Sequence, residues 1–141
     1  MTQDEPIRIL IAEQKKSLRA RMRKHFKEAG DFTVSAEARD LPETLQKART
    51  LPLDVIVIND QLPPMENAHA SAMLRREGVH TSILSFADTL EPGLIQLSFR
   101  HGVNGFMHIE EIDGLLVKAV RRICKGEPYF SPRVRKVYFE D

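Results

Sequence analysis

Two short clusters of polar side chains stand directly after apolar runs, and their residue types limit the chemistry they could perform. Glu13 and Gln14 follow one run, and Asn59 and Asp60 follow another. A carboxylate can act as a nucleophile or help to bind a hard cation such as Mg²⁺, whereas an amide is a poor nucleophile. The clusters form a site only if the fold brings the ends of the two runs together.

Apolar patterning predicts an alternation of strands and helices along the chain. Short β-branched runs, typical of strands buried on both faces, alternate with segments in which apolar residues repeat every three or four positions. The expected strands are residues 7–12, 32–36, 54–58, 81–86 and 105–109. The expected helices are residues 17–29, the segment between Asp40 and Pro52, a segment ending at Glu77, and residues 92–101 and 112–125.

This order of elements predicts an α/β fold of the flavodoxin-like (βα)5 type. Five strands joined to helices by short loops favour a parallel five-stranded sheet with helices on both faces. The strand order 2-1-3-4-5 is the simplest arrangement, and its crevice lies at the carboxyl ends of strands 1 and 3. We therefore expect Glu13, Gln14, Asn59 and Asp60 to lie at one edge of the sheet.

Composition indicates a single globular domain. The 141 residues include 42% hydrophobic and 29% charged residues, with no apolar run long enough to span a bilayer. The acidic N-terminus has no signal-peptide pattern, and a single cysteine, Cys124, excludes an internal disulfide. A cytoplasmic protein is expected, and the net charge of +1 gives no reason to expect direct nucleic-acid binding.

The same segments resemble the receiver domains of bacterial response regulators, particularly those of the NarL/LuxR (FixJ-like) type. The likeness covers about residues 7–132, and it is carried by the stretches 9–14, 52–63, 102–107 and 126–132. The resemblance implies a receiver domain at residues 1–127. It also implies that residues 128–141 are a C-terminal tail or the start of a linker to a DNA-binding domain.

The residues that run phosphorylation in this family are replaced at the corresponding positions. In the family, an acidic pair holds Mg²⁺, an aspartate accepts the phosphoryl group, a Ser or Thr ends strand 4 and a lysine ends strand 5. The corresponding residues here are Glu13 with Gln14, Asn59, Ala87 and Ile109, and Phe106 stands at the position of the switch aromatic. This coordinated loss predicts a degenerate pocket with no catalytic residue, no metal, no cofactor and no enzymatic activity.

The resemblance implies an atypical receiver domain that works without phosphorylation, as a protein-interaction and dimerisation module in signal transduction. Transcription would be controlled through an attached helix-turn-helix domain that this chain does not contain. A homodimer is expected, and the candidate partner surfaces are the basic first helix and the face formed by helix 4, strand 5 and helix 5. Within the crevice, Asn59 and Gln14 are expected to hydrogen-bond and to hold one loop conformation.

Three alternatives stay open from the sequence. A shift of one residue would make Asp60 a phosphoacceptor in a conventional response regulator, although strand alternation should aim Asp60 away from the crevice. The crevice could instead sense a small ligand. Asn59 could also be a turn former without a role, because asparagine is common at strand ends.

Overall fold

The computed structural model describes residues 5–64 and 70–139. Its strands are β1 (Ile7–Ala12), β2 (Phe32–Ala38), β3 (Val55–Asn59), β4 (Ser82–Ala87), β5 (Gly105–His108) and β6 (Tyr129–Phe130). Its helices are α1 (Lys16–Ala29), α2 (Leu41–Thr50), α3 (Ala70–Arg76), α4 (Pro92–Arg100), α5 (Ile112–Cys124) and α6 (Pro132–Tyr138), with a 3₁₀ turn, η1, at Ile109–Glu111. No helix in these two stretches is long and apolar enough to cross a membrane.

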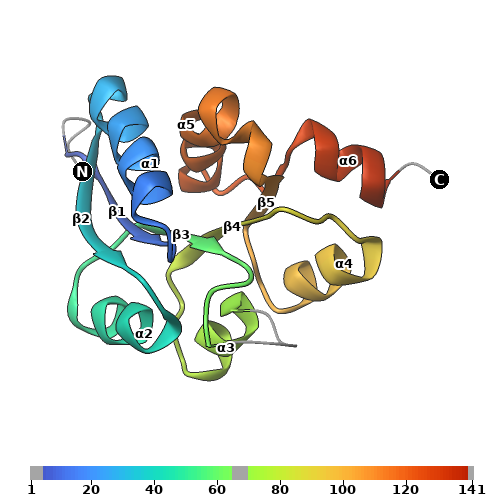
Figure 1. Ribbon diagram of the computed structural model, residues 1–141, viewed down its shortest axis with the longest axis horizontal. Coiled ribbons are helices and arrows are strands. Elements are labelled where there is room, and N and C mark those ends of the chain that lie inside the picture. Colours follow the sequence, from blue (N-terminus) through green and yellow to red (C-terminus); the bar gives the residue numbers. More distant parts are fainter. Residues whose placement is uncertain (1–4, 65–69, 140–141) are drawn as a thin grey trace.

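The strands form one parallel sheet in the order β2-β1-β3-β4-β5-β6. The predicted order of the first five strands is therefore confirmed, and a sixth strand is added beside β5. Helices α1 and α5 cover one face of the sheet, and α2, α3 and α4 cover the other (Figure 1). Two residues are too few to show the alternation that predicts a strand, which is why β6 could not be read from the sequence.

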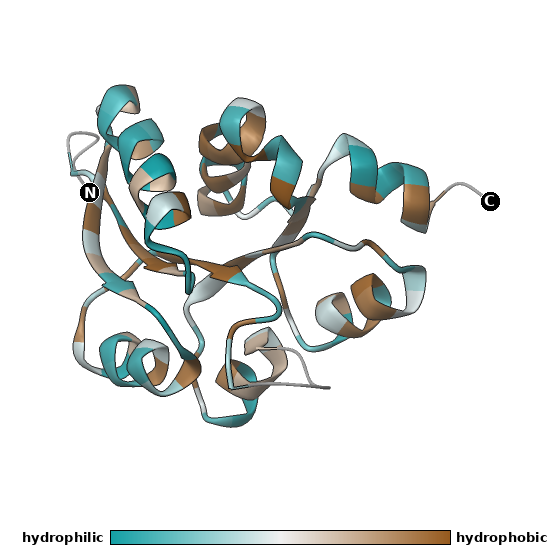
Figure 2. Cartoon of the chain, viewed as in Figure 1, coloured by the Kyte–Doolittle hydropathy of each residue, from teal (hydrophilic) through white to brown (hydrophobic). Residues whose placement is uncertain are grey.

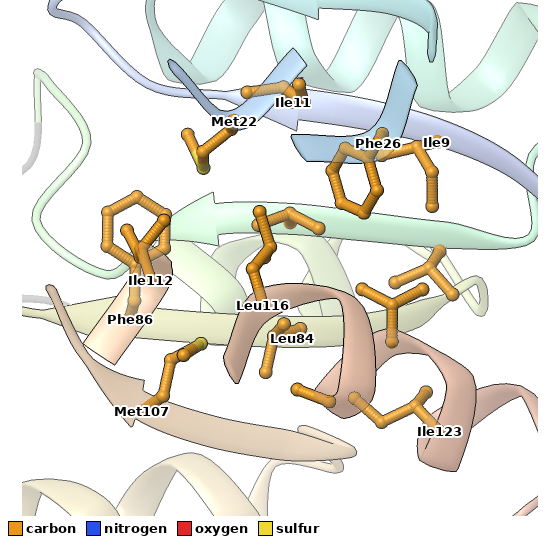
Figure 3. Packing of buried hydrophobic residues seen from close by; sticks show 14 of the residues in the cluster. Ile9, Ile11, Met22, Phe26, Leu84, Phe86, Met107, Ile112, Leu116 and Ile123 are labelled. Atoms are coloured by element: carbon orange, nitrogen blue, oxygen red, sulfur yellow. The ribbon is translucent and has the colours of Figure 1, made fainter. Parts of the chain in front are cut away.

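The larger core lies between the sheet and the pair α1 and α5, and it includes Ile9, Met22, Phe26 and Leu116 (Figure 3). The apolar residues at every fourth position of α1 are the buried ones, as the periodicity predicted. A second core lies beneath α2 and α3. Apolar residues face the sheet and polar residues face outward on the helices, which is the pattern expected when burial of apolar surface holds the layers together (Figure 2).

A third apolar cluster joins the C-terminal segment to the domain. Buried Val134 of α6 packs with Ala87, Ile95 and Phe106, which come from β4, α4 and β5. The helix begins with a Ser131 cap, whose hydroxyl accepts the Val134 N–H at 3.2 Å. The segment expected as a tail or linker after residue 127 is therefore folded onto the domain as far as residue 138, because α6 presents an apolar face of its own.

Candidate functional site

A small crevice opens where the loops after β1, β3, β4 and β5 meet. It has a volume of about 180 Å³. The residues that line it are Glu13, Gln14, Lys15, Asn59, Gln61, Leu62, Pro63, Asp88 and Ile109. The structure thus brings together four of the residues selected from the sequence, namely Glu13, Gln14, Asn59 and Ile109. The location follows from topology, since β1 and β3 are adjacent parallel strands and end at the same edge.

A hydrogen bond between Asn59 and Glu13 joins the two strand ends. Asn59 Nδ2 donates to Glu13 Oε1 at 2.8 Å, and Asn59 Oδ1 accepts the N–H of Gln61 at 2.9 Å. The second carboxylate oxygen of Glu13 accepts the N–H of Lys15 at 2.7 Å. Because a backbone N–H can only donate, the Asn59 oxygen must face Gln61 and its nitrogen must face the carboxylate. The amide is therefore oriented for this bond. Hydrogen bonds to both carboxylate oxygens stabilise Glu13 at a position where it is only 2% exposed.

The prediction of a hydrogen bond between Asn59 and Gln14 is wrong. The side chain of Gln14 is exposed, while its backbone oxygen accepts a hydrogen bond from Arg19 Nη1 at 2.9 Å. Of the two residues at the acidic pair position, Glu13 is the one whose side chain bonds to the end of β3.

Ala87 and Phe106 do not line the crevice. Both are buried in the third apolar cluster, where they pack beside Ile95 and Val134. The residue after Ala87, Asp88, lines the crevice instead. Asp88 is not among the residues predicted from the sequence, although it is the first polar residue beyond the expected fourth strand, a signal that could have identified it.

Ile109 lines the crevice from a position that differs from the expected one. The fifth strand was predicted to run to Ile109, but β5 ends at His108 and Ile109 begins the 3₁₀ turn η1. The imidazole of His108 caps this turn by accepting the N–H of Glu110 at 3.0 Å. A side chain that caps the following turn ends the strand one residue early.

Asp60 is buried beyond the end of β3 and does not line the crevice. It is 1% exposed, and its backbone N–H donates to the carbonyl of Phe86 at 2.8 Å. The hydroxyls of Ser71 and Ser85 each lie 3.4 Å from its Oδ1 atom. The carboxylate thus faces α3 and β4 from within the protein.

Comparisons with known proteins find similarity to response regulators and transcriptional regulatory proteins. No family model matches the sequence. An uncharacterized transcriptional regulatory protein, YvfU of Bacillus subtilis, is 26% identical over 129 residues, which cover 91% of this chain and 64% of that protein. The nitrate/nitrite response regulator protein NarL of Escherichia coli is 23% identical over 137 residues, with 97% of this chain and 63% of that protein covered.

Solved structures agree in fold. A LuxR-family two-component response regulator from Aurantimonas superposes with a TM-score of 0.86 at 23% identity, covering 96% of this chain and 97% of that one. The signal receiver domain of the putative response regulator NarL from Mycobacterium tuberculosis gives 0.79 at 24% identity, covering 87% and 99%. The fold is that of a receiver domain. The chain spans about three fifths of the length of the curated relatives it matches.

The receiver fold implies a bound Mg²⁺, and the donors in this crevice do not fit that ion. Mg²⁺ prefers several charged oxygens in octahedral geometry. Glu13 is the one buried carboxylate among the lining residues, and both of its oxygens already accept N–H groups, from Asn59 and from Lys15. Residues 5–64 and 70–139 contain no group of three or more His, Cys, Asp or Glu side chains that could hold a metal ion.

Proposed function

We propose that this chain is an atypical receiver domain that signals through protein contacts without being phosphorylated at the usual position. The hydrogen bond from Asn59 to Glu13 carries the proposal, since the residue that the resemblance aligns with the phosphoacceptor is an amide, and this amide is bonded to the carboxylate at the end of β1. An amide is too poor a nucleophile to form an acyl phosphate. The bond also uses the carboxylate that would otherwise be available to a cation.

Phosphorylation of Asp60 is the rival reading, and the position of this residue opposes it. A phosphoacceptor must be reached by the donor from the crevice, but Asp60 is absent from the crevice lining and is 1% exposed. Burial of a phosphoryl group beside Ser71 and Ser85 would also require the removal of a doubly charged group from water. We therefore assign Asp60 a structural role.

The output is proposed to be dimerisation and, through an attached helix-turn-helix domain, control of transcription. One similar structure is described as two RcsB dimers bound to two parallel DNAs, and the matched relatives include transcriptional regulatory proteins that extend beyond this chain. In this chain, the positive charge of α1 is partly neutralised across the α1 and α5 pair. Arg21 lies 2.9 Å from Asp113. This pairing lowers the like-charge repulsion between two copies of α1 in a symmetric dimer on this face.

Sedimentation equilibrium of the chain tests the proposed dimer. A monomer mass at all concentrations would contradict it.

Intact-mass spectrometry after incubation with acetyl phosphate and Mg²⁺ tests the absence of phosphorylation. We expect no change in the mass of this protein under conditions that fully phosphorylate an ordinary receiver domain run in parallel. The Asp60→Ala variant serves as the matched control, and it should behave as the parent does. A stoichiometric phosphate adduct on the parent would overturn the proposal, and its disappearance in Asp60→Ala would assign the adduct to that residue.

A further inference from the structure

A groove with an apolar floor and a basic rim lies between α5 and α6. Leu115, Phe130 and Pro132 supply apolar surface, with the largely buried Tyr129 beside them. The groove has a volume of about 190 Å³. Both helices supply lining residues, and α6 packs at the β5 and β6 edge of the sheet, where Val134 contacts the cluster that includes Ile95 of α4 (Figure 1).

The rim of this groove carries positive charge that the rest of the described chain neutralises only in part. Its charged lining residues are Lys118 and Arg122 of α5 and Arg135 of α6, and no carboxylate is among the lining residues. Arg122 lies 3.8 Å from Glu127, whereas Lys118 and Arg135 form no ion pair within residues 5–64 and 70–139. On α1, by contrast, Arg19, Arg21 and Arg23 all lie within ion-pair distance of a carboxylate.

The α6 wall of the groove is fixed to the end of the sheet. Arg133 Nη1 lies 2.7 Å from Glu110 Oε1 and 3.1 Å from His108 Nδ1, while the backbone N–H of Arg133 donates to Glu111 Oε2 at 3.1 Å. Val134 is fully buried beneath the helix. The groove is therefore present before any partner arrives, which lowers the conformational entropy that binding would cost.

We propose that this groove docks an acidic peptide segment of a protein partner, with an apolar side chain of that segment seated between α5 and α6. The two helices would supply cations on both sides of the bound chain, and Leu115, Phe130 and Pro132 would contact the apolar side chain. Charge complementarity selects the acidic partner, and the apolar floor selects a peptide that alternates charge with hydrophobicity. The groove lies away from the crevice, so this proposal stands or falls independently of the proposed function.

The aromatic contacts of Phe130 argue against a nucleic acid in this groove. Single-stranded nucleic acids use open aromatic faces on which bases stack. The Phe130 ring already packs against Phe99 with centroids 4.5 Å apart and against Phe139 at 5.0 Å. Phe130 is therefore already packed among aromatic rings of the protein itself.

Fluorescence polarisation with a labelled peptide Glu-Glu-Leu-Glu-Leu-Glu tests the proposal. The double variant Lys118→Glu with Arg135→Glu should bind this peptide at least about tenfold more weakly than the parent, because two attractive charges become repulsive. The matched control is Lys24→Glu with Lys27→Glu, which makes the same charge change at exposed positions of α1. The control should bind within about twofold of the parent.

A second peptide with both leucines replaced by serine separates docking from simple charge attraction. It should bind about tenfold more weakly than the first, because the apolar contact is lost. Equal binding of the two peptides, or an equal loss in the α1 control, would overturn the proposal in favour of non-specific attraction. Displacement of the peptide by double-stranded DNA at equal or lower concentration would instead assign the surface to nucleic acid. Circular dichroism melting of each variant verifies that it is folded.

Discussion

Replacement of Asn59 by aspartate is expected to destabilise the protein by about 2–4 kcal/mol at neutral pH, as measured by urea unfolding. The substitution exchanges the Nδ2 donor for an oxygen that lies about as far from Glu13 Oε1 as the present 2.8 Å. The two carboxylates would repel each other at a position where Glu13 is 2% exposed and solvent screening is weak. The loss of an attractive bond and the gain of a repulsive one act in the same direction.

The cost of Asn59→Asp should depend on pH with a definite sign. Repulsion by Glu13 raises the pKa of the introduced carboxyl in the folded state above its value in the unfolded chain. The folded variant therefore binds more protons than the unfolded one between these two pKa values, and its stability falls as pH rises through that window. The difference from the parent should be small near pH 4 and fully developed near pH 7.

Added Mg²⁺ provides the complementary measurement. The variant has two adjacent carboxylates that a cation can bridge, so Mg²⁺ should raise its melting temperature and leave that of the parent unchanged. Gln61→Glu is the matched control, since it adds the same charge at an exposed crevice residue. We expect Gln61→Glu to change stability by less than about 0.5 kcal/mol. A cost for Asn59→Asp as small as that of the control would contradict the role assigned to the Asn59 bond.

Much of the fold could be predicted because burial imposes patterns that the sequence carries. The β-branched run at residues 54–58 must become a strand covered on both faces, and the four-residue spacing of Leu18, Met22 and Phe26 is that of the buried face of a helix. The topology rules for parallel sheets then leave few arrangements. The strand and helix of the C-terminal segment, β6 and α6, were not predicted because they are short, and short elements show less than two periods of any pattern.

The candidate site was predicted as a location and not as a set of contacts. The strand ends fix which loops meet, so Glu13 and Asn59 were expected at one edge of the sheet. The path of each loop determines which side chain points toward the neighbouring strand end. In this structure Glu13, and not Gln14, bonds to Asn59. Asp88 was missed because nothing in the sequence marks it apart from its place after β4, and Ala87 turned into the core because its small apolar side chain packs against Phe106.

Truncation of Phe106 to alanine is expected to cost about 3–5 kcal/mol in the free energy of unfolding, measured by urea titration. The ring is fully buried, and its cluster comprises Ala87, Ile95 and Val134. Removal of the ring leaves a cavity beneath α6, because backbone pairing of β5 with β4 and β6 limits how far the sheet can relax. Amide hydrogens of residues 135–138 should therefore exchange faster in the variant than in the parent.

Met107→Ala is the matched control, since Met107 is the next residue of β5, is equally buried and belongs to the cluster beneath α1 and α5. We expect this variant to lose about 2–5 kcal/mol as well. Its effect on α6 should be confined to global unfolding, because alternation along the strand directs Met107 to the opposite face of the sheet. Faster amide exchange of α6 in Phe106→Ala, but not in Met107→Ala, would show that Phe106 connects the end of β4 at the crevice to the C-terminal helix. Equal exchange in both variants would show that α6 responds only to the overall stability of the domain, and Phe106 would then have no special connection to that helix.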